Sequence, residues 1–550
     1  MADGSRRRFL TDAARLLAAV PLGVRPLLDS AGRAMGATAS DDGAPLGAPA
    51  LHGLTPKGQV VRGGFADTDL AVGHALRDGR LGARSPASRR TRVAIVGGGV
   101  GGLSAGWHLD RLGLRDWLVL ELAPEAGGNA RAGENAVSRY PWGAHYLPVP
   151  APEASHVRAL LRELELLDAD GQFDERTLCH TPQERLFQHG RWHEGLEPLD
   201  AAPARERAQW TRWDAQVATW RASGAFRVPL ADTVSALDAR TRALVQALDG
   251  TTAAAWLDAN GYTAPTLRWW IEYGTRDDYG ASLAQASAWA MAHYFAGRPV
   301  HEDGPLTWPE GNAFLTRHLA ARAGDRLVTS APTLAVERVG TRWRVHTPRA
   351  VVDCDAVIWA APLFILPRVL PGATLPVVTE YAPWVVANVT LARRPRERGA
   401  PPAWDNVLYD SPSLGYVSAT HQSLEHPRDE TVWTWYHALV DRPARDARRQ
   451  LEADPWSAWR DFVLADLARA HPDIHACVTH IDVWRWGHAM ARPVPGVLAR
   501  RARLEMWRPA DRVFLAHADV SGFSIFEEAQ WQGVRAATQA ARTLGGAQLE

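Results

Sequence analysis

The stretch RVAIVGGGVGGLSAGWHLDRL, residues 92–112, decides the fold of this chain. It opens with a short apolar run, which is typical of a strand buried on both faces of a parallel sheet. A glycine-rich turn at 97–102 follows, and from Leu103 the apolar residues take helical spacing. A second apolar run, residues 117–120, ends at Glu121. We therefore expect one β-α-β unit of about 30 residues.

Gly97, Gly99 and Gly102 fit the G-x-G-x-x-G fingerprint of dinucleotide-binding proteins. The first glycine permits a tight turn, the second lets the backbone approach a pyrophosphate, and the third lets the helix pack closely on the sheet. The N-terminus of the helix would present free N–H groups and partial positive charge to the phosphates. Glu121, 19 residues after Gly102, is placed to bind ribose hydroxyls. NAD and FAD share this fingerprint, so other segments must distinguish them.

Further segments resemble the flavin-containing amine oxidase superfamily, which includes phytoene-desaturase-like enzymes. In that family the acid of the second strand is followed by a Gly-Gly pair and an arginine. Here these are Gly127, Gly128 and Arg131, with the arginine two residues later than in the commonest form. The stretch SAPTLAVE, residues 330–337, resembles the family's adenine-contacting strand, which implies that role for Thr333.

The end of the chain also resembles this family. In LAHAD, residues 515–519, the resemblance implies that Asp519 binds the ribityl or phosphate portion of FAD. The final helix, from about Phe526, would point its N-terminus at the flavin ring and stabilise negative charge there. His517 and Glu528 stand where the family has glycine, which puts a close backbone approach to the flavin in question at both points.

The resemblance implies an α/β fold in which a discontinuous Rossmann-like FAD-binding domain carries an inserted α+β substrate domain. We predict a signal-like segment at residues 1–39 and a linker, with at most one short helix, at 40–90. The FAD-binding domain would comprise 91–150, 300–375 and 505–550, and the substrate domain 151–299 and 376–504.

The N-terminal sequence SRRRFL, residues 5–10, resembles a twin-arginine export motif. A mildly apolar stretch at 13–28 and the small residues Ala-Thr-Ala at 37–39 complete the pattern of a cleavable signal. We expect export to the periplasm by the twin-arginine machinery. A basic arm or a short amphipathic helix on a cytoplasmic protein is the alternative interpretation.

Composition excludes several functions. The chain has 61 basic and 61 acidic residues and a formal net charge of zero, without the basic footprint of a nucleic-acid-binding protein. It contains no run of about 20 apolar residues that would span a membrane. Cys179, Cys354 and Cys477 are too far apart in sequence for a metal knuckle or a redox pair, so we expect buried thiols and no metal site.

The sequence says less about the reacting end. The loop around His145 resembles one that passes near the flavin, where a histidine can relay protons, although a histidine bonded to backbone fits equally well. Trp486, in RWGHA at 485–489, resembles a flavin-facing residue. Alternation along strands would put Trp484 with Trp486, and Trp433 with Trp435, on shared faces. Such rings can wall a substrate pocket, or they can be ordinary core.

Lys57 is the only lysine and precedes the predicted cofactor domain. Many enzymes of the resembling family place a lysine beside the reactive flavin nitrogen. This chain must use another residue there, or its chemistry differs from oxygen-dependent amine oxidation. No cysteine lies near the closing motif, so we expect FAD to be bound non-covalently.

We therefore predict an FAD-dependent oxidoreductase, similar to amine oxidases, that oxidises a C–N bond of a small molecule by hydride transfer to flavin. One alternative is a phytoene-desaturase-like enzyme acting on an apolar C–C bond. Another is a non-catalytic binding protein with the same fold. The complete set of glycines with Glu121 and Asp519 argues against the last, since such a protein need not keep flavin. The substrate and the electron acceptor stay open.

Overall fold

The structure is a computed structural model that describes residues 60–82, 85–199, 202–230, 237–298, 304–423 and 428–545. All of them belong to one compact unit, His52–Glu550. The predicted signal-like segment and Lys57 lie outside the described residues. Within the described ranges, no helix combines the length and the apolar character needed to cross a membrane.

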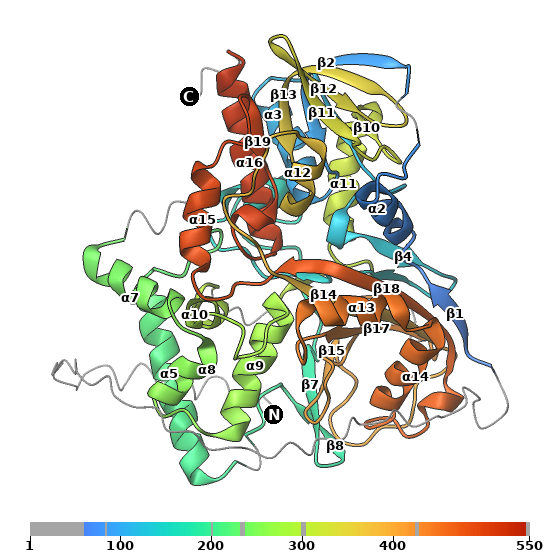
Figure 1. Cartoon of the computed structure of the whole chain (residues 1–550). Helices are drawn as coiled ribbons and strands as arrows, with labels where there is room; N and C mark the ends of the chain where they lie inside the picture. The colour runs from blue at the N-terminus through green and yellow to red at the C-terminus, as the bar shows by residue number, and fades with distance from the viewer. Residues whose placement is uncertain are drawn as a thin grey trace, which may run out of the picture. The chain divides into compact units, whose positions relative to one another are not determined.

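One sheet of seven strands, counted over the described residues, is built around the predicted β-α-β unit (Figure 1). Its order is β10-β3-β2-β13-β12-β11, and β19 also pairs with β13. The strands are β2 (Ser88–Val96), β3 (Trp117–Leu120), β10 (Leu327–Val328), β11 (Ala335–Val339), β12 (Arg342–His346), β13 (Val351–Trp359) and β19 (Val513–Leu515). The sheet thus joins three stretches that are far apart in sequence.

Both faces of this sheet are covered. Side chains alternate along β2, so Val93 and Ile95 enter a core with α3 (Val100–Arg111) and α16 (Phe526–Thr543). Ala94 and Val96 enter a second core on the opposite face. Burial on both sides explains why β2 reads as a continuous apolar run, and the mixed α/β architecture confirms the predicted fold class.

A larger sheet of eight strands, again over the described residues, has the order β1-β18-β14-β17-β16-β15-β7-β8. These strands are β1 (Arg62–Phe65), β7 (Glu184–Gln188), β8 (Arg191–Glu194), β14 (Tyr381–Leu391), β15 (Asp405–Leu408), β16 (Tyr416–Ser418), β17 (Thr431–Ala438) and β18 (Val478–Ala491). One face packs on α13 (Ala444–Ala453) and α14 (Trp456–Leu467). The other face carries Trp384, Tyr436 and Trp484.

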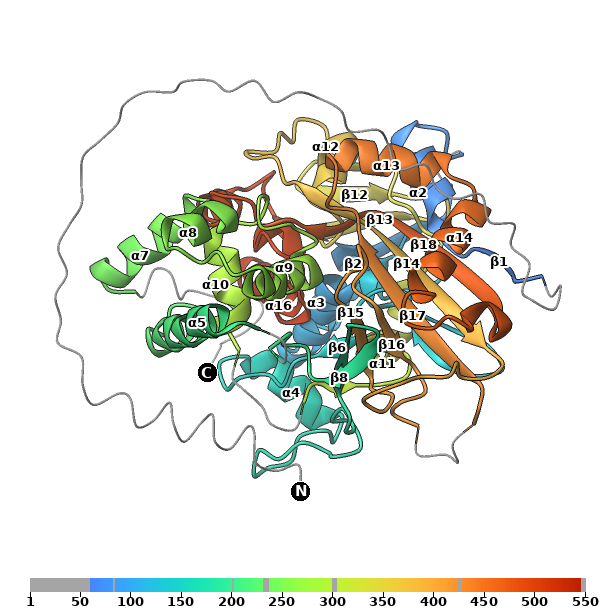
Figure 2. The ribbon, with the colours of Figure 1, turned by 90° about the horizontal axis from the view of Figure 1, so that it is seen from below.

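A group of helices forms a separate core beside the sheets, as Figure 2 shows. They are α5 (Ala204–Ala222), α7 (Ala239–Asp249), α8 (Ala253–Ala259), α9 (Pro265–Tyr279) and α10 (Ala288–Ala296). The remaining helices are α2 (Asp69–Arg77), α4 (Ser155–Glu163), α11 (Ala313–Ala323), α12 (Leu366–Val369) and α15 (Val497–Met506). Two short antiparallel pairs join β4 (Ala132–Glu134) to β5 (Arg139–Pro141) and β6 (Tyr146–Leu147) to β9 (Leu306–Thr307).

The stretch predicted as a linker is more ordered than expected. Its described part contains the predicted short helix, α2, and also β1, which pairs with β18 in parallel. Strand β2 begins at Ser88, five residues before the apolar run that starts at Val93. Residues 88–91 pair with β13, but 88–90 are exposed and polar, so they carry no hydrophobic signal for a strand. Cys179, Cys354 and Cys477 are buried and free, as predicted.

Candidate active site

The glycine turn between β2 and α3 has the geometry that the fingerprint predicts. Gly97 has φ +107°, and a Cβ there would lie 2.7 Å from the backbone of Ala360, so only glycine fits. A Cβ at Gly102 would lie 1.9 Å from the carbonyl oxygen of Gly97. At Gly99 a Cβ would meet only the Cα of Gly128, at 3.7 Å. The space in front of α3 is therefore open, and no side chain caps the helix there.

The Gly-Gly pair lies against this turn. The N–H of Gly127 donates to the carbonyl oxygen of Gly98 at 2.8 Å. Arg131 is close by, and its Nε donates to the carbonyl oxygen of Gly128 at 3.0 Å. Its Nη2, however, is 2.5 Å from the carboxylate of Asp69, so this guanidinium is already paired.

Glu121 follows β3, and its carboxylate faces the glycine turn. One oxygen accepts the N–H of Gly98 at 2.6 Å and the other accepts the N–H of Ala123 at 2.8 Å. Burial raises the pKa of this carboxyl, and the two backbone hydrogen bonds oppose that rise. Each carboxylate oxygen has a second lone pair, so the group can still accept from ribose hydroxyls.

Thr333 is brought to the same region, because the N–H of Ala331 donates to the carbonyl oxygen of Glu121 at 2.8 Å. Its hydroxyl is buried and has no hydrogen-bond partner among the described residues. An unpartnered buried hydroxyl is costly unless a ligand or water satisfies it.

Asp519 is fully buried in the closing turn, away from the cavity described below. Its Oδ2 accepts the N–H of Leu363 at 2.9 Å and the hydroxyl of Tyr381 at 2.5 Å. Its Oδ1 lies 3.1 Å from Nδ1 of His517. Burial disfavours a charge on this carboxyl, but the neighbouring His517 and the hydrogen bonds outweigh burial and lower its pKa.

His517 and Glu528, which stand where the family that the sequence resembles has glycine, have structural roles. His517 has φ −97°, a conformation open to any residue. Glu528 turns its carboxylate into the interior, where it accepts from the N–H of Leu230 and, at 2.6 Å, from the hydroxyl of Ser521. Neither position shows a backbone conformation that requires glycine.

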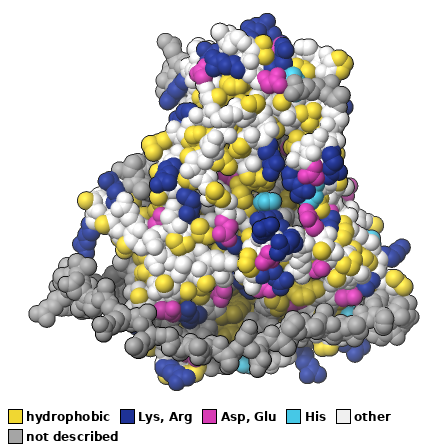
Figure 3. All heavy atoms as spheres, in the orientation of Figure 1, with side chains coloured by type: hydrophobic (Ala, Val, Ile, Leu, Met, Phe, Trp, Pro, Cys, Tyr) yellow, Lys and Arg dark blue, Asp and Glu magenta, His cyan; other side chains and the backbone are white. Residues whose placement is uncertain are grey.

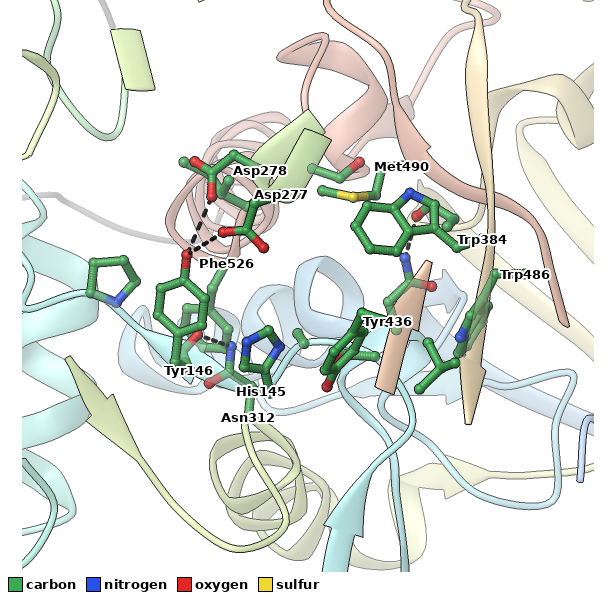
Figure 4. Close-up of a pocket in the computed structure, with 18 of the residues that line it drawn as sticks. His145, Tyr146, Asp277, Asp278, Asn312, Trp384, Tyr436, Trp486, Met490 and Phe526 are labelled. Atoms are coloured by element: carbon green, nitrogen blue, oxygen red, sulfur yellow. Dashed lines mark hydrogen bonds between the residues drawn. The ribbon is translucent and has the colours of Figure 1, made fainter. Parts of the chain in front are cut away.

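A cavity of about 810 Å³ lies at the N-terminus of α16 (Figure 4). Three of the predicted site residues line it: His145, Trp486 and Phe526. The lining residues that the sequence analysis did not name for it include Asn129, Tyr146, Asp277, Asp278, Arg298, Asn312, Trp384, Tyr436, Met490, Ser524 and Glu527.

Aromatic rings wall one side of the cavity. Trp384, Tyr436 and Trp486 project from neighbouring strands of the eight-stranded sheet, and Nε1 of Trp486 donates to the carbonyl oxygen of Trp142 at 2.7 Å. Trp433 and Trp435 share a face, as the alternation predicts, and of the two interpretations left open they are ordinary core, not a pocket wall. Both lie on the face opposite the cavity, in the core with α14. Side chains alternate along β17, so it is the neighbouring Tyr436 that points to the cavity side.

His145 packs against this wall, with its ring centre 4.6 Å from that of Tyr436 and the two ring planes tilted by 31°. Burial lowers the pKa of His145 to about 4, although a backbone hydrogen bond at Gly143 opposes the shift. The ring is therefore neutral at pH 7 and is suited to hydrogen bonding rather than to holding a charge.

The opposite end of the cavity is acidic. The hydroxyl of Tyr146 lies between the two acids of α9, donating to Asp277 at 3.3 Å and to Asp278 at 3.4 Å (Figure 4). Nη1 of Arg298 is 3.1 Å from Asp278, and its Nε is 3.9 Å from Glu527. Among the described lining residues, three carboxylates thus face one guanidinium.

Asp277 shows the consequence of this imbalance. Burial, and then the neighbouring charge of Asp278, raise the pKa of its carboxyl to about 7, while Tyr146 and Arg298 act in the other direction. A buried excess of negative charge must be relieved by a proton or by a cationic ligand.

A signal for these acids was present in the sequence. Asp277 and Asp278 are adjacent in the last turn of α9, where the helix dipole disfavours negative charge. A local rule broken in this way often marks a functional site.

The residues present fit a bound FAD. The open space before Gly99, the uncapped N-terminus of α3 and the unpartnered hydroxyl of Thr333 lie around Glu121, as a dinucleotide requires. At the other end, α16 begins at Phe526 without a side-chain cap and opens on the cavity. Outside the residues drawn in grey, basic and acidic side chains are interspersed on the face in Figure 3.

Comparison with known proteins supports the mixed α/β fold with a Rossmann-like domain. A family model described as an NAD(P)-binding Rossmann-like domain matches residues 95–164. No curated protein sequence matches the chain. Among solved structures, putrescine oxidase bound to putrescine is 16% identical and covers 83% of this chain and 100% of its own, with a TM-score of 0.60.

Two further structures are similar to the same extent. Cyclohexylamine oxidase from Brevibacterium oxydans is 16% identical over 83% of this chain and 99% of its own, with a TM-score of 0.61. A CLA-producing fatty acid isomerase from P. acnes is 16% identical over 82% and 98%, with a TM-score of 0.58. At these identities the likeness shows the fold: a mixed α/β protein with a Rossmann-like dinucleotide-binding domain.

Proposed function

We propose that this protein is an FAD-dependent oxidoreductase that oxidises the C–N bond of an amine. The observation that carries the proposal is the cavity at the N-terminus of α16, which has aromatic walls and an acidic end. Aromatic faces and buried carboxylates together suit a positively charged amine on an apolar skeleton. Two of the structures similar in fold are an oxidase of putrescine and an oxidase of cyclohexylamine, which agrees with this choice.

The proposed roles divide along the cavity. When bound, FAD supplies the acceptor for the hydride and its electron pair. Trp384, Tyr436 and Trp486 would hold the carbon skeleton and exclude water. Asp277 and Asp278 would bind the ammonium group. An ammonium must lose a proton before its C–N bond can be oxidised, and the carboxylate of Asp277, with a pKa of about 7, can accept it.

A second candidate function is oxidation or isomerisation at an apolar C–C bond. The aromatic wall and the apolar side chains of Val386 and Met490 favour it. The likeness to a fatty acid isomerase agrees with it as well. The acidic end argues against it, because an apolar substrate would leave three carboxylates against the single guanidinium of Arg298.

An anaerobic spectral titration distinguishes these two functions. We expect a cationic alkylamine to bleach the flavin absorption bands, and an uncharged alkene of similar size to leave them unchanged. Asp278→Asn removes one carboxylate from the acidic end. In this variant the amine concentration needed to bleach the flavin should rise at least about tenfold. Bleaching by the alkene alone would support oxidation at a C–C bond instead. Isomerisation transfers no net electrons to the flavin, so it would show as conversion of the alkene without bleaching.

A further inference from the structure

Residues 61–69, named the strap here, enter the fold before the dinucleotide-binding unit and run along the edge of the larger sheet (Figure 1). In β1 the register is defined from Arg62 opposite His480 to Phe65 opposite Val483. Gly63 has φ +139°, and a Cβ there would lie 1.8 Å from a backbone carbonyl oxygen of β18. This edge therefore accepts the strap in one specific register.

The first anchor of the strap is Asp67. Its carboxylate accepts from Nε and Nη2 of Arg485 at 2.7 and 3.0 Å, and from the backbone N–H of Arg485 at 3.0 Å. The side chains of Asp67 and Arg485 are only 6% and 13% exposed. The guanidinium also lies over the ring of Phe65, 3.6 Å from its centre. A two-pronged, nearly buried pair of this kind fixes geometry as well as charge.

The second anchor is Asp69, which is 2.5 Å from Nη2 of Arg131. These side chains are 19% and 8% exposed. The same guanidinium lies 4.8 Å from the ring centre of Trp484 and 5.8 Å from that of Trp486. Arg131 thus connects the strap to Trp484 and to Trp486, which stacks on Trp484 and lines the cavity.

This connection reaches both ends of the candidate active site. Trp486 lines the cavity and donates from Nε1 to the carbonyl oxygen of Trp142. The backbone N–H of Trp142 in turn donates to the carbonyl oxygen of Arg131 at 2.9 Å. On the cofactor side, burial is the largest influence on the pKa of Glu121, and among the weaker ones Arg131 lowers it while Asp69 raises it. The charge of Arg131 is therefore felt where the cofactor ribose is expected.

We propose that Asp67 and Asp69 are positioning residues: through Arg485 and Arg131 the strap fixes Trp484 and Trp486 and cancels a positive charge beside the cavity. Removal of Asp69 would take from the nearly buried Arg131 the carboxylate at 2.5 Å and leave only the weaker influence of Glu121, which is unfavourable and lets the guanidinium move. The same uncompensated charge would repel a cationic substrate. That last consequence rests on the proposed amine oxidation, whereas the anchoring does not.

The test uses the full-length chain with Asp67→Asn and Asp69→Asn. We expect hydrogen exchange of the β1 amides to rise at least about tenfold in each variant. In Asp69→Asn the flavin absorption bands should also shift, and KM for a cationic amine should rise about three- to tenfold with kcat changed less than about twofold. Asp69→Glu should restore the bands and most of KM.

Asp78→Asn is the matched control. Asp78 belongs to the same N-terminal region and pairs with Arg77 at 2.7 Å, but both side chains are largely exposed. It should change none of these quantities. The proposal would be overturned if the β1 amides of the two variants exchanged hydrogen as slowly as in the wild-type protein. It would also be overturned if the flavin spectrum and KM were unchanged in Asp69→Asn. The exchange measurement needs neither flavin nor substrate, so it decides the anchoring even if amine oxidation proves wrong.

Discussion

Asp277 is the residue on which the chemistry depends most. It faces Asp278 on its own helix, Tyr146 on β6, and Arg298 beyond α10. Because the folded pKa, about 7, is above that of an unfolded carboxyl, ~4, the folded protein binds this proton more tightly. Its contribution to stability is complete below pH ~4 and is lost as the pH rises through about 7. Ionisation over that range creates the negative charge that a cation would need.

A permanently charged probe isolates this titration. We expect a quaternary ammonium compound to bind more tightly as the pH rises through about 7. Below pH 7, its dissociation constant should increase up to about tenfold for each unit by which the pH falls. Such a probe has no proton of its own to lose, so the slope reports the protein. Perturbation of the flavin spectrum measures the dissociation constant.

Asp277→Asn should flatten that dependence. Asp258→Asn is the matched control, since Asp258 is an exposed acid in the same group of helices and pairs with Arg268. If binding to the wild-type protein is independent of pH between 5 and 8 (about three units around the pKa), then Asp277 is not the group that receives the cation.

At the scale of elements, α3 and α16 approach each other unusually closely. A Cβ at Gly533 would lie 2.2 Å from the carbonyl oxygen of Gly101, and a Cβ at Gly101 would lie 2.0 Å from that of Ala516. Glycine at both positions lets the two helices that border the candidate site pack backbone to backbone. Their N-termini open toward the expected dinucleotide and toward the cavity.

Gly533→Ala tests this packing. The added methyl group collides with backbone that cannot rotate away, so we expect a loss of about 1–3 kcal/mol in the free energy of unfolding. Gly73→Ala in α2, where a Cβ would meet nothing within 4 Å, should be neutral or stabilising by up to about 1 kcal/mol. Equal stability of the two variants in denaturant titrations would show that the helices are not in contact as described.

The elements differ in how well the sequence predicted them. The β-α-β unit and the final helix were predictable, because their apolar periodicity and glycines are local. Strand β1 was not, since RGGF owes its structure to the edge of β18 rather than to its own pattern. The face on which Trp433 and Trp435 lie was not predictable either. Alternation along a strand says which residues share a face, but not which face meets the cavity.

At the scale of the whole molecule, the candidate site draws on segments that lie far apart in sequence. His145, Asp277, Trp384 and Phe526 line one cavity although they belong to four separate elements or loops. Long-range assembly of this kind leaves no pattern in a single sequence. For this reason the glycine motif, which is local, could be recognised in the sequence, while the cavity could not. The adjacent acids at the end of α9 were visible, but neither their place in the cavity nor most of the aromatic wall was predictable.

The central claim is that the turn at residues 97–102 holds a dinucleotide and that this dinucleotide is FAD. The most direct measurement is to denature the purified protein, release its cofactor and identify it by mass and absorption spectrum. We predict FAD at about one molecule per chain. We also predict none from a folded Gly99→Val variant, because that side chain fills open space without striking the backbone. Wild-type protein that releases no flavin, and takes up none when FAD is added, would contradict the account.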